Sequence, residues 1–331
     1  MAHTVLILTD EADQAASQVA AELAVRGVPV IRLDAADFPG KIAMAATITS
    51  GHAWAGPLTC GGNELVELSQ VGAIYCRRPT QFQMNERMSA PERAFAYGEA
   101  RRGFGGALAA LGLDGRCLWL NDPVAAARAE YKPVQLAAAA SAGLAIPPTL
   151  ITSDPQAAHT WATDLGQPVI YKALGGFWHT DEGRIRALYT SPIEDPELLL
   201  DPALALTAHL FQQQITPKLC EARAVVIGSR VHAVRIDAAS EQARIDWRSD
   251  YDALTYALID LPADVASALV ELHRRLGLVY GAADLVCDMS GQWVFLETNQ
   301  RGEWGWLAGE AGLPVASSIA DVLEAGPAWT R

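Results

Sequence analysis

The sequence has 331 residues, of which 50% are hydrophobic and 19% are charged. At roughly 100 to 200 residues per domain, this length predicts about two or three domains. The composition excludes wholesale disorder, a collagen-like repeat and a small disulfide-stapled scaffold. The formal charge of -13 argues against a nucleic-acid partner, because Lys and Arg side chains must neutralise the phosphates that such proteins bind.

Neither a membrane segment nor an export signal is expected. No uninterrupted apolar stretch approaches the ~18 residues that a membrane-spanning helix needs. The apolar run Val5–Leu8 is followed by Asp10 and Glu11, whereas a signal peptide has a basic start and a longer apolar run. The cysteines are odd in number and form no C-x-x-C pair, which indicates reduced thiols in a cytoplasmic protein. They are Cys60, Cys76, Cys117, Cys220 and Cys287.

The first part of the chain has the pattern of a β-α-β unit. Strands are expected over Val5–Leu8 and Val28–Leu33, with a helix over Ala12–Arg26 between them. This order suggests nucleotide binding, but the turn Thr9–Asp13 has no glycine and carries carboxylates that would repel a pyrophosphate. A Walker-type phosphate loop is also absent from the sequence. Further strands are expected over residues 43–48 and 73–76, and a helix over residues 91–111.

The pattern changes near residue 120. A helix is expected to start at Asn121-Asp122-Pro123 and to be interrupted at Lys132-Pro133 before it continues to Gly143. Beyond Thr149, strands and helices mix and antiparallel hairpins dominate, so the second half is expected to be α+β and not doubly wound. The strands are expected over residues 169–172, 185–189, 210–214, 221–227 and 231–236.

The segment Gly281–Asn299 reads as an acidic β-hairpin. Two strand-like runs flank Ser290-Gly291, a two-residue turn signal. With that turn, Asp284 lies directly opposite Glu297, and two like charges so placed are destabilising unless something offsets them. A divalent cation is the simplest remedy.

A third oxygen donor follows in the same strand. Asn299 lies two residues beyond Glu297 and therefore on the same face. Two carboxylates and an amide suit Mg²⁺, which usually keeps waters and takes substrate phosphates as its other ligands. The alternative is a solvated acidic face, but Val286 and Phe295 are expected on that face and favour partial burial.

Several basic residues could meet phosphate. Lys172 ends an apolar strand and precedes a glycine-bearing loop, which could present its ammonium to a phosphate chain or be an ordinary turn. Lys132 lies at a helix break and could equally be a surface lysine. Asp246 and Arg248 could form a surface ion pair, or a phosphate clamp beside a general base. Spacing alone leaves these alternatives open.

In this order the motifs resemble the ATP-grasp superfamily, and more narrowly the ATP-grasp ribosomal peptide maturases, the macrocyclases of microviridin-like graspetides. The resemblance covers nearly the whole chain. The residues that carry it are Tyr75–Pro79, Asn121–Leu136, Tyr171-Lys172, Gln213–Ile215 with Lys218, Glu221–Arg223, Asp246–Arg248, Gly281–Asp284, Glu297–Asn299 and Gly302–Trp306.

The resemblance implies an α+β ATP-grasp fold, in which an N-terminal α/β domain precedes central and C-terminal subdomains that clasp ATP. The implied boundaries are 1–120, 121–210 and 211–331. It also implies a role for each site residue. Lys132 and Lys172 would hold the ATP phosphates, under a flap over 175–183 that includes Gly175 and Gly176. Gln213, Gln214 and Ile215 would form the adenine hinge beside Lys218. Asp284, Glu297 and Asn299 would bind Mg²⁺, Arg223 and Arg248 would clamp the transferred phosphoryl group, and Asp246 would be the candidate base.

The implied activity is an ATP- and Mg²⁺-dependent ligation that forms side-chain esters or amides in a ribosomal precursor peptide, through an acyl phosphate on Asp or Glu. The partners would be that peptide, with leader contacts between Tyr189 and His209, and a second copy in a homodimer. Arg77 and Arg78 could bind an acidic core peptide or be structural. The alternatives are a glutamate-adding ligase and a catalytically silent ATP- or peptide-binding adaptor.

Overall fold

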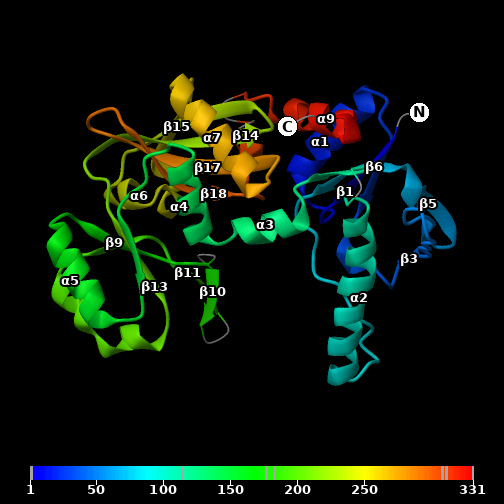
Figure 1. Ribbon diagram of the computed structural model, residues 1–331, viewed down its shortest axis with the longest axis horizontal. Helices are drawn as coiled ribbons and strands as arrows, with labels where there is room; N and C mark the ends of the chain where they lie inside the picture. The colour runs from blue at the N-terminus through cyan, green and yellow to red at the C-terminus, as the bar shows by residue number, and fades with distance from the viewer. Residues whose placement is uncertain are drawn as a thin grey trace.

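The computed structural model describes residues 3–113, 115–175, 178–181, 184–306, 309 and 312–329. Between residues 178 and 187 it describes the backbone only. Figure 1 shows an N-terminal lobe on one side and a C-terminal lobe on the other, joined at the top. The central sheet extends below the C-terminal lobe, and one end of helix α2 extends below the N-terminal lobe. Within the described residues, no helix is long and apolar enough to cross a bilayer.

The N-terminal lobe contains a parallel sheet in the order β2-β1-β6-β7, as expected for an α/β unit. Its elements are β1 (Thr4–Leu8), α1 (Gln14–Val25), β2 (Val30–Leu33), β6 (Val71–Cys76), α2 (Ala90–Ala110) and β7 (Leu118–Leu120). The strand expected over 43–48 is shorter and belongs to a separate antiparallel sheet. That sheet comprises β3 (Ile42–Met44), β4 (Pro57–Cys60) and β5 (Asn63–Glu67).

The central sheet is antiparallel and has the order β12-β9-β13-β8. Its elements are β8 (Thr149–Thr152), α5 (Pro155–Leu165), β9 (Val169–Lys172), β12 (Ser191–Ile193) and β13 (His209–Gln213). A separate hairpin pairs β10 (Trp178–Asp181) with β11 (Arg184–Ala187). The 3-10 turns Pro196–Leu200 and Pro202–Leu206 precede β13.

The C-terminal sheet is antiparallel, with the order β16-β15-β14-β17-β18. Its elements are β14 (Lys218–Ile227), β15 (Arg230–Ala238), α6 (Glu241–Ile245), β16 (Leu254–Ile259), α7 (Ala263–Leu276), β17 (Tyr280–Asp288), β18 (Trp293–Asn299) and α9 (Val315–Ala325). Helices α3 (Pro123–Ala129) and α4 (Lys132–Ser141) share one hydrophobic cluster with α7 and this sheet. The proposed boundary at residue 121 therefore places α3 and α4 with the central unit although they pack on the C-terminal one.

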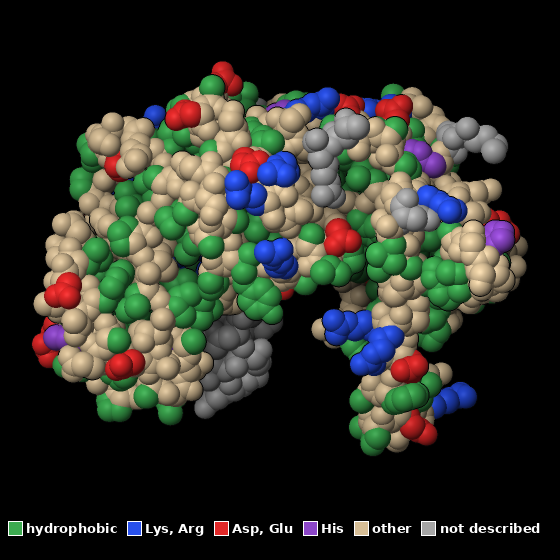
Figure 2. Space-filling model, in the orientation of Figure 1, with side chains coloured by type: hydrophobic (Ala, Val, Ile, Leu, Met, Phe, Trp, Pro, Cys, Tyr) green, Lys and Arg blue, Asp and Glu red, His purple; other side chains and the backbone are tan. Residues whose placement is uncertain are grey.

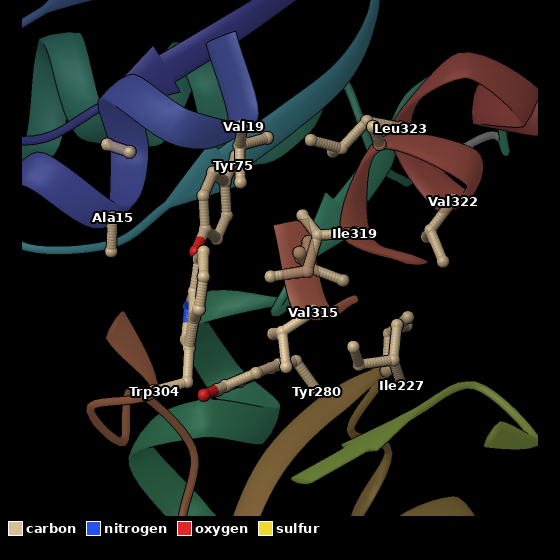
Figure 3. Packing of buried hydrophobic residues seen from close by; sticks show 14 of the residues in the cluster. Ala15, Val19, Tyr75, Ile227, Tyr280, Trp304, Val315, Ile319, Val322 and Leu323 are labelled. Atoms are coloured by element: carbon tan, nitrogen blue, oxygen red, sulfur yellow. The ribbon is translucent and has the colours of Figure 1, made fainter. Parts of the chain in front are cut away.

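A shared hydrophobic core joins the N-terminal and C-terminal lobes. It combines residues of β1, α1 and β6 with residues of β14, β17 and α9. Figure 3 shows Tyr75 of β6 end to end with Trp304, beside Tyr280 of β17 and Ile319 of α9. Because these side chains are buried together, the two lobes form one body, and groups from both can be held in fixed positions.

Candidate active site

The β17–β18 hairpin brings the predicted metal ligands together. Asp284 on β17 lies directly opposite Glu297 on β18, as the sequence predicted. Asn299 lies opposite Ala282, two residues along each strand, so it shares their face of the sheet. The oxygen-bearing side chains of Asp284, Glu297 and Asn299 therefore occupy one side of the hairpin.

The hairpin reaches this register by another route than the predicted one. Its turn has three residues, 289–291, so the prediction of a two-residue Ser290-Gly291 turn is wrong. A bulge at Leu296 adds one residue to β18 and restores the opposition of the two carboxylates. The prediction that Phe295 shares the face of the two carboxylates is also wrong, because the bulge places Phe295 in the hydrophobic cluster on the opposite face.

Side-chain cations offset the charges of the two carboxylates. Arg223 on β14 donates from Nη1 to both carboxylate oxygens of Asp284, at 2.8 and 2.9 Å. Glu297 accepts hydrogen bonds from Lys132 Nζ and from Arg248 Nη1, the second at 3.2 Å. The repulsion expected between the opposed acids is therefore relieved by three cations of the protein itself.

Burial and neighbouring charges shift the pKa values of Glu297 and Lys172. Burial alone would raise the pKa of Glu297, but nearby positive charges outweigh this effect and hold the pKa well below its ordinary value. Those charges belong to Lys132, Lys172 and Arg248. Burial is also the main reason that the pKa of Lys172 is lowered, although its Nζ donates to Gln212 Oε1 at 3.4 Å. A bound polyanion would favour the charged form of this lysine.

The donor set of the hairpin fits a hard divalent cation. Two carboxylates and an amide are oxygen ligands of the kind that Mg²⁺ takes, together with waters and substrate phosphates. In the described part of the chain, no group of three or more His, Cys, Asp or Glu side chains forms a metal cluster. Asp284, Glu297 and Asn299 are therefore better suited to an ion that shares its ligands with a substrate than to an ion that the protein encloses alone.

Asp246 is fully engaged by its neighbours. Arg248 donates from Nε and Nη2 to its two oxygens, at 2.8 and 2.9 Å. Thr190 adds its backbone N–H and its hydroxyl, at 3.2 and 3.1 Å. Burial would raise the pKa of Asp246, but these bonds and the charge of Arg248 outweigh burial and lower it. The interaction connects the segment after β11 to the guanidinium that also contacts Glu297.

An inner cleft lies between the central and C-terminal sheets. It has an empty volume of about 570 Å³, which includes open solvent at its mouth. Its walls include the predicted hinge, and also Lys218, whose Nζ donates to Glu221 Oε1 at 2.5 Å. Burial raises the pKa of Glu221 despite this partner. The hinge residues in the wall are Gln213, Gln214 and Ile215.

An outer groove continues from the inner cleft. Four residues line both hollows and mark their junction, namely Lys172, Thr190, Arg248 and Glu297. The outer groove is also lined by Lys132, Asn299, Glu130 and Gln300, none of which lines the inner cleft. A long ligand could therefore lie with one end at the hinge and its charged part at the junction, and leave the outer groove open to a second substrate.

Most of the residues predicted from sequence line these two hollows. The lining residues are Lys132, Lys172, Gly175, Gln213, Gln214, Ile215, Lys218, Asp246, Arg248, Asp284, Glu297 and Asn299. Arg223 reaches the site through Asp284. Gly176 lies outside the described residues, as do parts of the predicted flap. Sequence reasoning gave no site role to Glu130, Thr190, Gln212 and Glu221, although they line the two hollows. Glu130 and Glu221 lie within motifs that carry the resemblance, but the resemblance implied roles only for their neighbours.

Buried amides fix the strand that carries Glu297 and Asn299. Gln135 of α4 donates to the backbone oxygen of Thr298 at 2.9 Å and accepts from its N–H at 2.8 Å. Asn121 donates to the backbone oxygens of Tyr280 and Gln300, at 2.8 and 2.9 Å. Both amides are buried. Thr298, between the predicted metal ligands Glu297 and Asn299, and Gln300, directly after them, are therefore held by side chains of the segment 121–135.

The structure places Arg77 and Arg78 in different environments. Arg77 is 2% exposed and binds Glu303 at 2.6 Å and the backbone oxygen of Gly302 at 3.3 Å. It also lies 3.2 Å from a carboxylate oxygen of Asp13. Arg78 is largely exposed and pairs only with Glu303 among the described residues. Of the two roles considered, Arg77 has the structural one, because a fully buried and paired guanidinium cannot receive a peptide.

Comparisons with known proteins agree with this geometry. Residues 4–126 match the MvdD pre-ATP grasp domain. A RiPP-associated ATP-grasp ligase from Chryseobacterium gregarium, solved with ADP and a leader and core peptide, is 27% identical, with a TM-score of 0.87 over 97% of this chain and 96% of that chain. No curated protein sequence matches the chain.

Two macrocyclases from Microcystis aeruginosa MRC are similar over the same extent. MdnC, solved with the precursor peptide MdnA, is 27% identical, with a TM-score of 0.81 over 97% of this chain and 99% of that chain. MdnB is 26% identical, with a TM-score of 0.76 and the same coverage. The chain therefore has the expected α+β ATP-grasp fold. Within that superfamily, it is similar over nearly its whole length to a RiPP-associated ligase and to macrocyclases, as the resemblance to the ATP-grasp ribosomal peptide maturases predicted.

Proposed function

We propose that the protein is a cytoplasmic, ATP- and Mg²⁺-dependent ligase that installs side-chain ester or amide crosslinks in a ribosomally made precursor peptide. One observation carries this proposal. Lys132, Lys172 and Arg248 converge on Glu297 where the inner cleft meets the outer groove. Such a concentration of cations beside two carboxylates suits a nucleoside triphosphate whose terminal phosphate points toward a second substrate. The ADP and peptides in the Chryseobacterium gregarium ligase support the same assignment.

The proposed chemistry has two steps. First, a carboxylate oxygen of an Asp or Glu in the peptide attacks the γ-phosphorus of ATP, the bond to the bridging oxygen breaks, and ADP leaves. Second, a Ser or Thr hydroxyl or a Lys amine attacks the acyl carbon, phosphate leaves with the electrons of the C–O bond, and the attacking group loses a proton. The peptide loses one water in total, and ATP becomes ADP and phosphate.

The side chains supply position and charge for these steps. Lys132 and Lys172 would hold the phosphates, while Arg223 and Arg248 would meet the negative charge of the transferred group. Mg²⁺ held by Asp284, Glu297 and Asn299 would neutralise phosphate charge. Gln213–Ile215 and Lys218 would receive the nucleoside end. Because both oxygens of Asp246 are already bonded, we assign it the positioning of Arg248 in preference to the role of base.

Intact-mass analysis of the precursor peptide tests the activity. The peptide is sought in the short open reading frame beside the gene, as a core with repeated Ser or Thr and Asp or Glu. Incubation with ATP and Mg²⁺ should remove one water mass per ring. A mass increase would instead identify an amino-acid ligase, and ATP binding without turnover an adaptor. ATP turnover that leaves the peptide mass unchanged would overturn the proposal.

We also propose a homodimer that uses α2. One end of this helix projects from the N-terminal lobe (Figure 1), and Phe95 on it is 71% exposed beside an apolar hollow. The surrounding segment 83–106 has four arginines and three glutamates. Two copies that meet at this segment would therefore not repel each other there, although each copy has a net charge of -13. Phe95→Asp should shift the protein to monomer in sedimentation, whereas Val25→Asp on α1 should not. A monomeric wild-type protein would contradict this proposal.

A further inference from the structure

The acidic residues along the inner cleft and outer groove differ in their partners. Most are bonded to a cation, Asp284 to Arg223, Glu297 to Lys132 and Arg248, Asp246 to Arg248, and Glu221 to Lys218. Glu130 in the wall of the outer groove is exposed and has no cationic partner among the described side chains. In this set, Glu130 is therefore the carboxylate that can accept a proton without first breaking an ion pair.

Glu130 is nevertheless held in a defined place. It follows the last turn of α3 and directly precedes the segment that begins α4. Gln300 donates from Nε2 to Glu130 Oε1 at 3.1 Å. The backbone of Gln300 is fixed in turn, because its oxygen accepts from Asn121 Nδ2 at 2.9 Å. One carboxylate oxygen is thus oriented by a buried residue, and the other is left for a ligand in the groove.

The location suits the second substrate. Glu130 lines the same groove as Lys132, Asn299 and Glu297, and it does not line the inner cleft that contains the hinge. Figure 2 shows that the surface between the part of the molecule with the central sheet and α2 is broadly hollowed, so a peptide can approach from outside. An acyl phosphate formed at the junction of the two hollows would therefore meet its nucleophile on the side where Glu130 lies.

The second step needs a proton acceptor on that side. An uncharged hydroxyl or a protonated amine attacks poorly until its proton is removed, and a carboxylate within reach can remove it. Asp246 is less suited, because Arg248 and Thr190 occupy both of its oxygens. We propose that Glu130 accepts the proton from the Ser or Thr hydroxyl, or the Lys ammonium, that closes the ring. One proton moves to the free oxygen of Glu130, the new C–O or C–N bond forms, and phosphate departs with the electrons of the broken C–O bond. With a Lys ammonium, the departing phosphate takes the second proton.

This inference rests on the proposed ligase function, and one experiment separates the two. The precursor peptide, ATP and Mg²⁺ are incubated with the enzyme, with and without hydroxylamine. Hydroxylamine is uncharged and strongly nucleophilic near neutral pH, so it traps an acyl phosphate as a hydroxamate without help from a base. Hydroxamate reports the first step, and loss of water from the peptide reports the second.

The Glu130→Gln variant should form hydroxamate at the wild-type rate but close rings about 10²-fold more slowly. Glu130→Asp should recover part of the ring-closure rate. The matched control is Glu64→Gln on β5, an exposed glutamate outside both hollows, which should behave as wild type. The Mg²⁺ concentration at half-maximal rate should be the same in wild type and Glu130→Gln.

Three outcomes would overturn the role of Glu130. They are ring closure by Glu130→Gln at the wild-type rate, an equal loss of hydroxamate and ring product, and a raised Mg²⁺ requirement, which would make Glu130 a metal ligand instead. Failure of the ligase proposal looks different, because wild-type enzyme would then give neither hydroxamate nor ring.

Discussion

Arg223 and Asp284 lie directly opposite each other on β14 and β17 and form a buried ion pair. Burial disfavours the charged guanidinium, but Asp284 outweighs this and raises the pKa of Arg223. Asp284 therefore has Arg223 on one side and Glu297 on the other, within a single sheet. The sheet itself fixes the separation between a predicted phosphate clamp and both predicted metal carboxylates.

Stability measurements can test this pair. Arg223→Met should lower the free energy of unfolding by about 3 to 5 kcal/mol, because Asp284 is left buried without its partner. Adding Asp284→Leu should recover much of the loss, since an apolar pair replaces the unpaired charge. Urea unfolding of the wild type, both single variants and the double variant gives the coupling. Additive losses would show that the two charges do not stabilise each other.

Lys172 should matter more for phosphoryl transfer than its modest contacts suggest. Its neighbours include Lys132 and Arg248, and a bound triphosphate would be the anion that balances these charges. Lys172→Met should lower precursor-dependent ADP release by about 10²-fold or more. Lys41→Met removes an exposed lysine paired with Asp37 in the N-terminal lobe and should leave the rate unchanged. Equal rates in the two variants would exclude Lys172 from the phosphate site.

The acidic hairpin shows how far the sequence could predict the site. The opposition of Asp284 and Glu297 was predicted correctly because two departures cancelled, one extra residue in the turn and one bulge residue at Leu296. Phe295 lies between these two departures and was therefore assigned to the wrong face. The alternation of side chains along a strand predicts the face of the sheet on which each one lies, but only up to a bulge. No residue pattern in the sequence indicated the bulge at Leu296.

The groups that position the site could not be predicted. Arg77 meets Glu303 across 226 residues, and Gln135 meets Thr298 across 163. No local spacing connects such partners. Arg77 and Glu303 become neighbours only when the two lobes share a core, and Gln135 and Thr298 only when α4 packs on the C-terminal sheet. Glu130 was missed for a similar reason, since an exposed glutamate after a short helix has no feature of its own until the groove around it is known.

Arg77 should control the segment that follows the metal ligands. It binds Gly302 and Glu303 from the N-terminal lobe, and a methionine there would leave Asp13 and Glu303 without this partner. Arg77→Met should destabilise the protein by about 3 to 5 kcal/mol. Arg78→Met, which removes an exposed pair with Glu303, should cost less than about 1 kcal/mol. Similar losses in the two variants would mean that burial of Arg77 is unimportant.

His273 of α7 lies beneath the hairpin and supports it from the other face. Its Nδ1 donates to the backbone oxygen of Leu269 at 2.7 Å, so its Nε2 accepts from the Thr298 hydroxyl at 3.0 Å. Gly281 makes room for the ring, because a Cβ atom there would lie 2.2 Å from Nε2. Burial lowers the pKa of His273 to about 4, with the Leu269 bond opposing the shift.

This lowered pKa makes stability depend on pH. Between pH 6.5, the ordinary pKa of histidine, and about 4, the unfolded chain binds a proton at His273 and the folded chain does not. The contribution is complete above that window and is lost as the pH falls through it, by up to roughly 3 kcal/mol. In urea unfolding, the free energy of unfolding of wild type should exceed that of His273→Gln by less as the pH falls through this window. The corresponding difference between wild type and His52→Gln, which changes an exposed histidine, should stay constant. A pH-independent difference for His273→Gln would mean that the ring protonates in the folded protein.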